Sequence, residues 1–291
     1  MPRRPPPRAG SEPASRGTGG VAMVDMTFQP CGVISITTDF GHRGPFVGTM
    51  KGVMLNRFPA ARIVDLTHET HVHWPAEAGF WLERSFRYFP SGTVHLAVVD
   101  PGVGTGRGVL LVLGAGHLFL APDNGLLAGV IERTAGTACQ VEHDRLGALR
   151  LGTLSATFHG RDFFAPLAAA LAAGSLEPRA IATPTEDYVP ALIERPARRG
   201  RELAGCVITA DHFGNLITNI EAADLAGFEQ PVVKAAGHVL PLHRTYGDVP
   251  PGTLLALVNS FAVLEIACAE QNASALLGLG RGGPVVVTEG G

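Results

Sequence analysis

Residues 33–39 read VISITTD, a run of apolar and β-branched residues that ends at an aspartate. Such a run is typical of a buried strand. Outward from it, helical patterns at 46–58 and 78–89 alternate with strand-like runs at 61–66 and 93–99. Strands that alternate with helices predict an N-terminal α/β domain with a largely parallel sheet.

The predicted N-terminal domain spans residues 31–193. Residues 109–113 and 118–120 read as a hairpin, and the Ala- and Leu-rich stretch 162–173 predicts a helix that Gly174 stops. In the helix predicted at 78–89, aromatic residues mark the side expected to be buried: Phe80, Trp81, Phe86 and Phe89.

The chain changes character between residues 193 and 202, where the stretch ERPARRGRE is polar and basic. This stretch is predicted to be a linker. Beyond it, short apolar runs with Gly and Pro breaks fill residues 203–288, and few helical patterns remain. They predict a smaller all-β, barrel-like C-terminal domain.

The composition narrows the class of protein. With 46% apolar and 17% charged residues and a net charge of −3, a sizeable core is expected and nucleic acid is not an expected partner. No run approaches the roughly 18 apolar residues of a membrane helix. Four cysteines without a C-x-x-C pair favour reduced thiols and a cytoplasmic protein.

Residues 1–30 open with a stretch rich in Pro, Arg, Gly and Ser. The stretch lacks the apolar core of a secretory signal. We expect a disordered leader there, or a translation start at Met23 or Met26.

Two of the predicted strands are followed by aspartates, Asp39 and Asp100. In open α/β sheets ligands bind outside the carboxyl ends of strands, and a carboxylate there suits the hydroxyls of a ribose. Both aspartates are equally compatible with turns, since Asp-x-Gly and Asp-Pro-Gly favour them. The glycine-rich stretch 101–108 is not a Walker phosphate loop, but it could aim Arg107 into a cleft.

Two predicted loops hold histidines that could serve in chemistry. In the stretch 155–164, SATFHGRDFF, His159 is a candidate general base, and Arg161 and Asp162 read as an ion pair or as charges at a helix N-terminus. The stretch 67–74, THETHVHW, holds three histidines but lacks the H-E-x-x-H spacing of a zinc protease. A polar loop, rather than a metal site, is expected there.

The second domain has its own candidate loop at 210–220, ADHFGNLITNI. An asparagine such as Asn215 has donors and acceptors for a purine edge, and Phe213 offers a stacking face. The stretch reads equally as a hairpin turn with a core phenylalanine. Asn259 and Ser260, which follow the run LLALV, read equally as a strand end.

Eight segments between residues 34 and 287, taken in order, resemble the family of S-adenosylmethionine-dependent hydroxide adenosyltransferases, relatives of the fluorinases and chlorinases. They are TTDFG, VGTMKGVML, IVDLTHE, FPSGTVHLAVVDPGVGT, APDNGLL, SATFHGRDFFAPLAA, FGNLITNI and LVNSFAVLEIA. The resemblance implies hydrolysis of S-adenosyl-L-methionine (SAM) at C5′ of the ribose to adenosine and L-methionine, with no cofactor and no metal. It also implies a homotrimer whose sites lie between the N-terminal domain of one subunit and the barrel of the next.

The resemblance further implies a role for each site residue. The catalytic residues would be Asp100, Arg107 and His159, and the ribose-binding carboxylate would be Asp39. The other substrate contacts would come from the barrel domain, to adenine from Phe213, Asn215 and Tyr246, and to the amino-acid end of the methionine from Asp211 and Ser260.

The chain departs from the family pattern at two places near the implied site. His73 stands where relatives usually carry an aromatic residue, and Phe261 stands where the halogenases hold an arginine. The first departure changes the expected wall of the ribose pocket. The second changes the expected contacts to the methionine end.

Two alternative functions differ from hydrolysis in what they require. A SAM-dependent halogenase resembles this family but carries hydroxyl side chains at the positions of Asp100 and His159, and a carboxylate would repel a bound halide. A non-catalytic adenosine or SAM-binding protein would need Asp39, Phe213 and Asn215, but not the three catalytic residues together.

Overall fold

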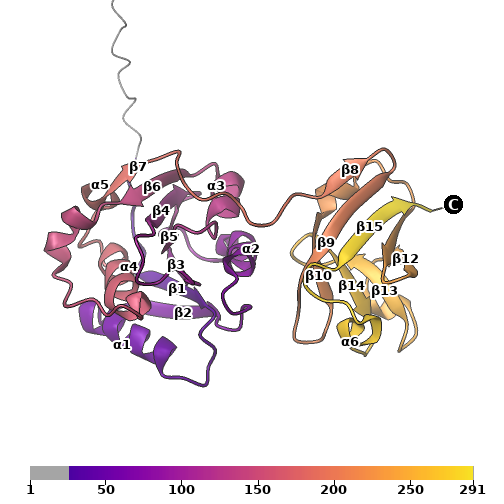
Figure 1. Ribbon diagram of the computed structural model, residues 1–291, viewed down its shortest axis with the longest axis horizontal. Helices are drawn as coiled ribbons and strands as arrows, with labels where there is room; N and C mark the ends of the chain where they lie inside the picture. Colours follow the sequence, from indigo (N-terminus) through magenta and orange to yellow (C-terminus); the bar gives the residue numbers. More distant parts are fainter. Residues whose placement is uncertain (1–25, 291) are drawn as a thin grey trace, which may run out of the picture.

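The computed structural model describes residues 26–290. The N-terminal sheet consists of β1 (Val33–Thr38), β2 (Arg62–Thr67), β3 (Val94–Val98), β4 (Val109–Gly114), β5 (His117–Pro122), β6 (Thr137–Val141) and β7 (Ala182–Pro184). Their order is β2–β1–β3–β5–β4–β6–β7 (Figure 1). The pairs β2–β1, β1–β3 and β3–β5 are parallel, and the hairpin β4–β5 and the pairs beyond it are antiparallel. The predicted α/β domain and its hairpin are confirmed.

Helices cover both faces of this sheet. They are α1 (Phe46–Arg57), α2 (Pro75–Ser85), α3 (Ala128–Thr134), α4 (Ala165–Ala172) and the short α5 (Pro178–Ile181). One face packs its apolar side chains under α1 and α4, and the other packs under α2 and α3. Because the sheet is sandwiched, its central strands are buried on both sides and read as continuous apolar runs rather than as alternating ones.

The C-terminal strands close into a barrel. They are β8 (Ala197–Arg199), β9 (Glu202–Ala210), β10 (Leu216–Glu221), β11 (Pro231–Ala235), β12 (His238–His243), β13 (Leu254–Val258), β14 (Val263–Cys268) and β15 (Pro284–Glu289), with one short helix, α6 (Ala273–Leu277). Seven strands in the order β9–β10–β14–β13–β12–β11–β15 return to β9, and β8 pairs with β9 outside the ring. The predicted barrel is confirmed.

Three local predictions are changed by the structure. The stretch 193–202 is not wholly a linker, because β8 forms within it. The helix predicted at 162–173 begins as a π-helix, η3 (Gly160–Phe164), before it continues as α4. In the helix predicted at 78–89, Phe80 and Phe86 are buried as expected, whereas Trp81 and Phe89 are half-buried.

The expected leader, residues 1–30, lies outside the described residues up to residue 25. From residue 26 the chain packs on the N-terminal domain: Met26 is buried in the core under α1 and α4, and Phe28 packs beside it. No helix within residues 26–290 is long and apolar enough to cross a bilayer.

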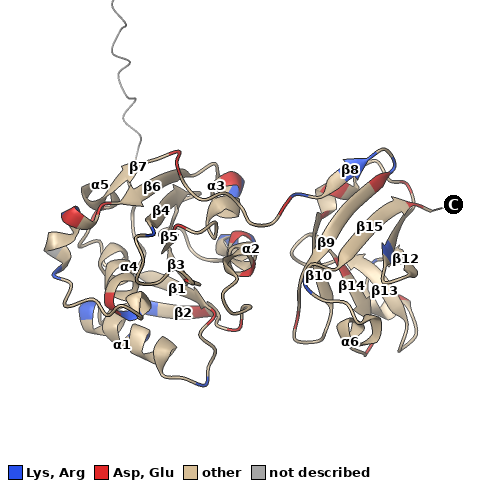
Figure 2. Ribbon diagram, in the orientation of Figure 1, with Lys and Arg blue, Asp and Glu red and all other residues tan. Residues whose placement is uncertain are grey.

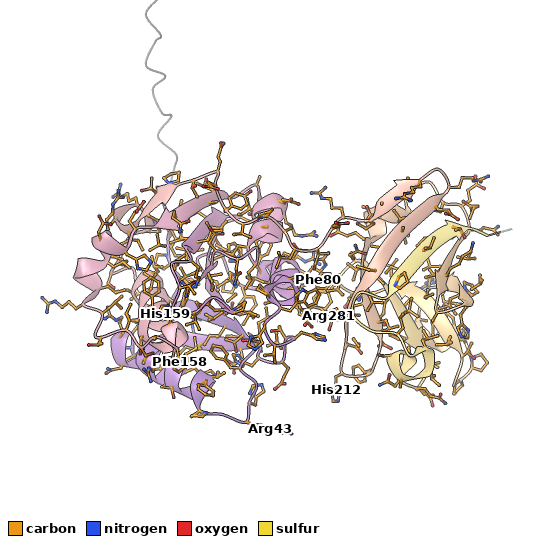
Figure 3. All side chains as sticks on the ribbon, in the orientation of Figure 1. Arg43, Phe80, Phe158, His159, His212 and Arg281 are labelled. Carbon is orange, nitrogen blue, oxygen red and sulfur yellow. The ribbon has the colours of Figure 1, made fainter. Side chains whose placement is uncertain are left out.

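The two domains meet at an apolar contact that centres on α2. The Trp81 ring lies 5.5 Å from the Phe261 ring of the barrel, and Phe80 packs with Ile208 and Ile217. Figure 3 shows Phe80 and the barrel residue Arg281 at this junction, and the Arg281 guanidinium lies 4.7 Å from the ring centre of Trp74. The junction therefore has an apolar centre of its own, built from side chains of both domains.

Charged side chains border the same junction. Glu221 at the end of β10 accepts a 2.8 Å hydrogen bond from buried Arg84 of α2, and it also pairs with Arg133 of α3. Figure 2 shows residues of both signs side by side on α2 and α3. One barrel carboxylate thus holds two guanidinium groups of the N-terminal domain, beside a cavity of about 520 Å³.

A buried histidine pair occupies the end of the sheet away from Asp39. His95 on β3 accepts or donates a 2.6 Å hydrogen bond with Ser35 of β1, contacts His117 at 3.2 Å, and stacks on Phe119 at 4.9 Å. Burial, together with the neighbouring His117, lowers the pKa of His95 from 6.5 to about 3. His95 is therefore neutral in the folded protein at ordinary pH.

We expect the free energy of unfolding to fall as the pH drops below the ordinary value for histidine. The folded protein binds a proton at His95 less readily than the unfolded chain, so stability is full above about pH 6.5 and is lost toward about pH 3. At about 1.4 kcal/mol per pH unit, the loss from this residue is about 2 kcal/mol at about pH 5. Urea unfolding of wild type and His95→Gln at about pH 7 and about pH 5 checks it. The variant should lose less stability between the two pH values, and parallel losses would contradict the prediction.

Candidate active site

Two loops at the carboxyl end of the sheet carry the candidate catalytic residues. Asp100 follows β3, Arg107 lies in the glycine-rich turn before β4, and His159 directly precedes η3. The turn approaches the second loop so closely that a Cβ on Gly104 would lie 2.4 Å from the carbonyl oxygen of Ala156. Gly104 also has a φ of +78°, so glycine is required there both for space and for backbone conformation.

The three candidate catalytic side chains form one connected group. Arg107 donates from Nε to both carboxylate oxygens of Asp100, at 2.9 and 3.0 Å, and from an Nη to Oδ2 at 2.5 Å. The same Nη lies 3.3 Å from Nδ1 of His159. The side chains of Asp100 and Arg107 are 5% and 11% exposed. A bidentate pair this well buried fixes the guanidinium plane, and that plane then meets the imidazole edge.

This arrangement can orient and polarise a small molecule bound beside it. Asp100 neutralises Arg107, so the group does not carry a large net charge, while the guanidinium keeps directed donors. The Arg107 guanidinium also lies 5.3 Å from the ring centre of Phe164, which covers it on one side. His159 is half-buried and offers a group that can take or hold a proton.

The loop that carries His159 is held in place by hydrogen bonds among its own residues. Arg161 donates to Asp162 from Nε at 2.6 Å, which confirms the predicted ion pair. Asp162 also accepts from the backbone N–H of Ser155 at 2.9 Å, and the Ser155 hydroxyl accepts from the N–H of Phe158. Hydrogen bonds from Arg161 and Ser155 hold the pKa of Asp162 well below its usual range.

Asp39 lies one residue beyond β1, at the same edge of the sheet as Asp100. Its Oδ2 accepts a 2.9 Å hydrogen bond from the backbone N–H of His73. His73 has a φ of +64°, a left-handed conformation that non-glycine residues adopt at a cost of about 1–3 kcal/mol. The backbone of this loop is thus turned so that its amide faces the carboxylate.

The barrel loop between β9 and β10 is organised by Asp211. Its carboxylate accepts from the backbone N–H groups of Phe213 and Asn215, both at 2.9 Å, and from the Asn215 side chain at 3.1 Å. Phe213 is left 73% exposed, so it is not the core residue of a hairpin turn. An exposed ring held on a rigid turn is suited to stack on a flat partner.

A second part of the barrel forms a cavity of about 350 Å³. Tyr246 donates to Oε1 of Glu265 at 2.6 Å, and Asn259 donates to Oε2 at 3.0 Å. Burial raises the pKa values of both Tyr246 and Glu265. The walls combine barrel residues with one residue of α2, and they include Trp81, Asp211, Tyr246, Ser260, Phe261 and Glu265.

Sequence reasoning missed two members of this cavity. Glu265 lies in an apolar strand, VLEIAC, where its only signal is that it is the one charged residue of a buried run. Trp81 is predicted only to lie on the buried side of its helix; it is half-buried, and it packs in a cluster with the barrel residues Ile208 and Ile217.

The candidate residues form two groups that do not meet within one chain. Among the interactions of residues 26–290, no hydrogen bond, ion pair or ring contact joins Asp39, Asp100 or His159 to the barrel residues. Figure 3 shows His159 inside the N-terminal domain and His212, the neighbour of Phe213, at the lower edge of the barrel, on the side toward the N-terminal domain.

Sequence profiles of known families match most of the chain. The profile described as the SAM hydroxide adenosyltransferase N-terminal domain matches residues 34–182, and the profile of the C-terminal domain matches residues 205–286. The chain belongs to this family. The two matches correspond to the sheet domain and to the barrel, and the segments quoted from the sequence fall within them or at their edges.

Several relatives of this chain are known. A (R)-S-adenosyl-L-methionine hydrolase of Thermus thermophilus is 38% identical over 85% of this chain and 96% of its own length. One of Salinispora tropica is 37% identical over 88% of this chain and 98% of its own. A fluorinase of Actinoplanes is 29% identical over 81% of this chain and 90% of its own. The crystal structure of an uncharacterized conserved protein from Thermotoga maritima covers 88% of this chain and 100% of its own, with a TM-score of 0.80 and 32% identity.

Proposed function

We propose that this protein hydrolyses SAM to adenosine and L-methionine, as the names of its hydrolase relatives indicate for those proteins. Those names specify the (R) form at the sulfonium, and we extend that preference to this chain. The observation that carries the proposal is the contact of Asp100, Arg107 and His159 at the carboxyl end of the sheet.

The chemistry to be supplied is the activation of water. The sulfonium leaves as neutral methionine, so the departing group needs no proton and the reaction needs no cofactor. Water is the difficult partner, because its pKa in bulk is about 15.7. The water oxygen forms a bond to C5′ while the C5′–S bond breaks and its electron pair stays on sulfur, and one water proton is released.

In this proposal Arg107 stabilises the hydroxide character that develops on the attacking oxygen, and His159 holds the water or receives its proton. Asp100 fixes Arg107 through the bidentate pair. A carboxylate at this position disfavours a halide in place of the water, because both are anions. The halogenase alternative is also less supported, since the fluorinase relative is less similar than the hydrolases.

We further propose that the complete site is shared between copies of the chain in a homotrimer in the cytoplasm. Asp39 would bind the ribose hydroxyls from one subunit. The barrel of the next subunit would supply Phe213, Asn215 and Tyr246 for adenine, and Asp211 and Ser260 for the methionine end. The separation of the two residue groups within one chain supports a shared site, and the free thiol state of all four cysteines supports the location.

The activity is tested by incubating the purified protein with (R)- and (S)-SAM in halide-free buffer and separating the products by chromatography. Adenosine and methionine should appear in equal amounts, and faster from the (R) form. Binding of SAM without any adenosine would contradict the enzyme and favour a binding protein. A halogenated nucleoside that forms only when halide is added would favour a halogenase.

A further inference from the structure

His68, which the proposed reaction does not use, is the centre of a buried network that ends one residue from Asp39. The imidazole is 1% exposed and has a different partner at each nitrogen. Nδ1 lies 2.8 Å from the hydroxyl of Thr38, and Nε2 lies 3.0 Å from Oδ1 of Asp65. Asp65 in turn accepts from Lys51 at 2.6 Å.

The neighbours of the imidazole favour one tautomer. Oδ1 of Asp65 lies at ion-pair distance from Nε2 but is not aligned for a hydrogen bond, and its negative charge favours the imidazole proton on Nε2. With the proton there, Nδ1 accepts the hydroxyl proton of Thr38. The Thr38 oxygen keeps a lone pair for the backbone N–H of Phe40, which donates to it at 3.2 Å. Burial lowers the pKa of His68, which favours the neutral ring that this pattern needs.

The loop that carries His68 forms hydrogen bonds to the chain on both sides of Asp39. Thr70 donates to the carbonyl oxygen of Thr38 at 3.1 Å, and the carbonyl oxygen of His68 accepts from the N–H of Gly41 at 2.8 Å. His73 donates its N–H to the Asp39 carboxylate. The residues before and after Asp39 are therefore tied to the segment 68–73, with His68 as the one member that contributes both side chain and backbone.

We propose that His68, acting through Thr38 and anchored by Asp65, is a positioning residue that sets the Asp39 carboxylate for the two hydroxyls of a ribose. It touches neither substrate nor reacting atoms. The inference rests on the proposed function, because it takes Asp39 as the ribose-binding carboxylate.

The experiment compares the affinities of two nucleosides for each variant by calorimetry. Adenosine has both ribose hydroxyls and 2′,3′-dideoxyadenosine has neither, so the ratio of their dissociation constants measures recognition by Asp39. Wild type should prefer adenosine by about 100-fold, since hydrogen bonds to a charged group are strong. Thr38→Val keeps the shape of the side chain but cannot donate to His68, and His68→Leu removes both nitrogens. Both should lower the ratio to under about 10-fold.

Two controls separate positioning from loss of stability. Thr38→Ser keeps the hydroxyl and should keep the wild-type ratio. His95→Gln disturbs another buried histidine that is bonded to β1, at Ser35, and should also keep the ratio while it lowers stability. A misfolded fraction would lower the number of binding sites titrated by both nucleosides equally and leave the ratio of their dissociation constants unchanged.

The outcomes separate this inference from the proposed function. If Thr38→Val and His68→Leu keep the wild-type ratio, the positioning role is wrong even though hydrolysis of SAM stands. If wild type itself does not distinguish the two nucleosides, or Asp39→Ala leaves the ratio intact, Asp39 does not bind ribose and the inference fails with it. Release of adenosine from SAM is measured independently of both results.

Discussion

Replacing Arg107 by alanine should lower kcat for SAM hydrolysis by about 1,000-fold, the usual cost of removing one preorganised donor from a developing anion. The guanidinium is held on Asp100 by three hydrogen bonds, so it is already oriented before substrate binds. Because its role is confined to the attacking oxygen, the dissociation constant of adenosine should stay within about threefold of wild type. Single-turnover product formation and calorimetry with adenosine measure the two quantities.

Two further variants test the cause of that loss. Arg107→Lys keeps the charge but not the planar fork, so it should recover only part of the rate. Arg179→Ala removes an exposed arginine whose one ion pair among residues 26–290 is with Glu177, and it should leave kcat unchanged. If Arg107→Ala weakens adenosine binding as much as it slows the reaction, Arg107 serves substrate binding or folding rather than the chemical step.

Two inactive variants should restore activity when their chains are mixed. His159→Ala impairs the N-terminal half of each site, and the double variant Phe213→Ala/Tyr246→Ala impairs the barrel half by removing two exposed rings. In a cyclic trimer that contains both variants, about one site in three joins an intact N-terminal domain to an intact barrel, whichever variant is in excess. Co-expression and purification through two affinity tags should therefore yield mixed trimers with about a third of the wild-type kcat/KM.

The control for this experiment is the same pair of variants purified separately and mixed after folding, which stays at the sum of the parents unless subunits exchange. Mixed assemblies that remain at the sum of the parents would show that each site lies within one chain. A protein that light scattering shows to be monomeric under assay conditions would contradict the trimer directly.

The sequence predicts the strands of the fold wherever an apolar run is long and has clear ends. VISITT and TVHLAVV are such runs, and they form β1 and β3. The strand β12, HVLPLH, was not predicted, because histidines at both ends and a proline in the middle hide its apolar residues. The strand β8 falls within the predicted linker, since three exposed residues including two arginines carry no apolar signal; in the described part of the chain its strand partner is β9.

The candidate site was accessible only in part. The resemblance named Asp100, Arg107 and His159, but their mutual contact depends on two loops that meet at Gly104 and Ala156, which no local pattern predicts. The network of His68 joins residues about 30 positions apart, so spacing alone suggested only a polar loop. Glu221 and Arg84 are 137 residues apart, and their pairing follows from how the domains dock.

The π-helix after His159 makes the orientation of the imidazole depend on the number of residues in that one helical turn. In η3 the N–H of Ala165 bonds back to the carbonyl of Gly160, one residue further than in an α-helix. Loss of a single codon between them would convert the turn to ordinary α geometry and rotate the preceding chain by about 100° relative to α4. An in-frame deletion is thus a short mutational route by which a lineage could redirect this histidine while every other side chain of the catalytic group is kept.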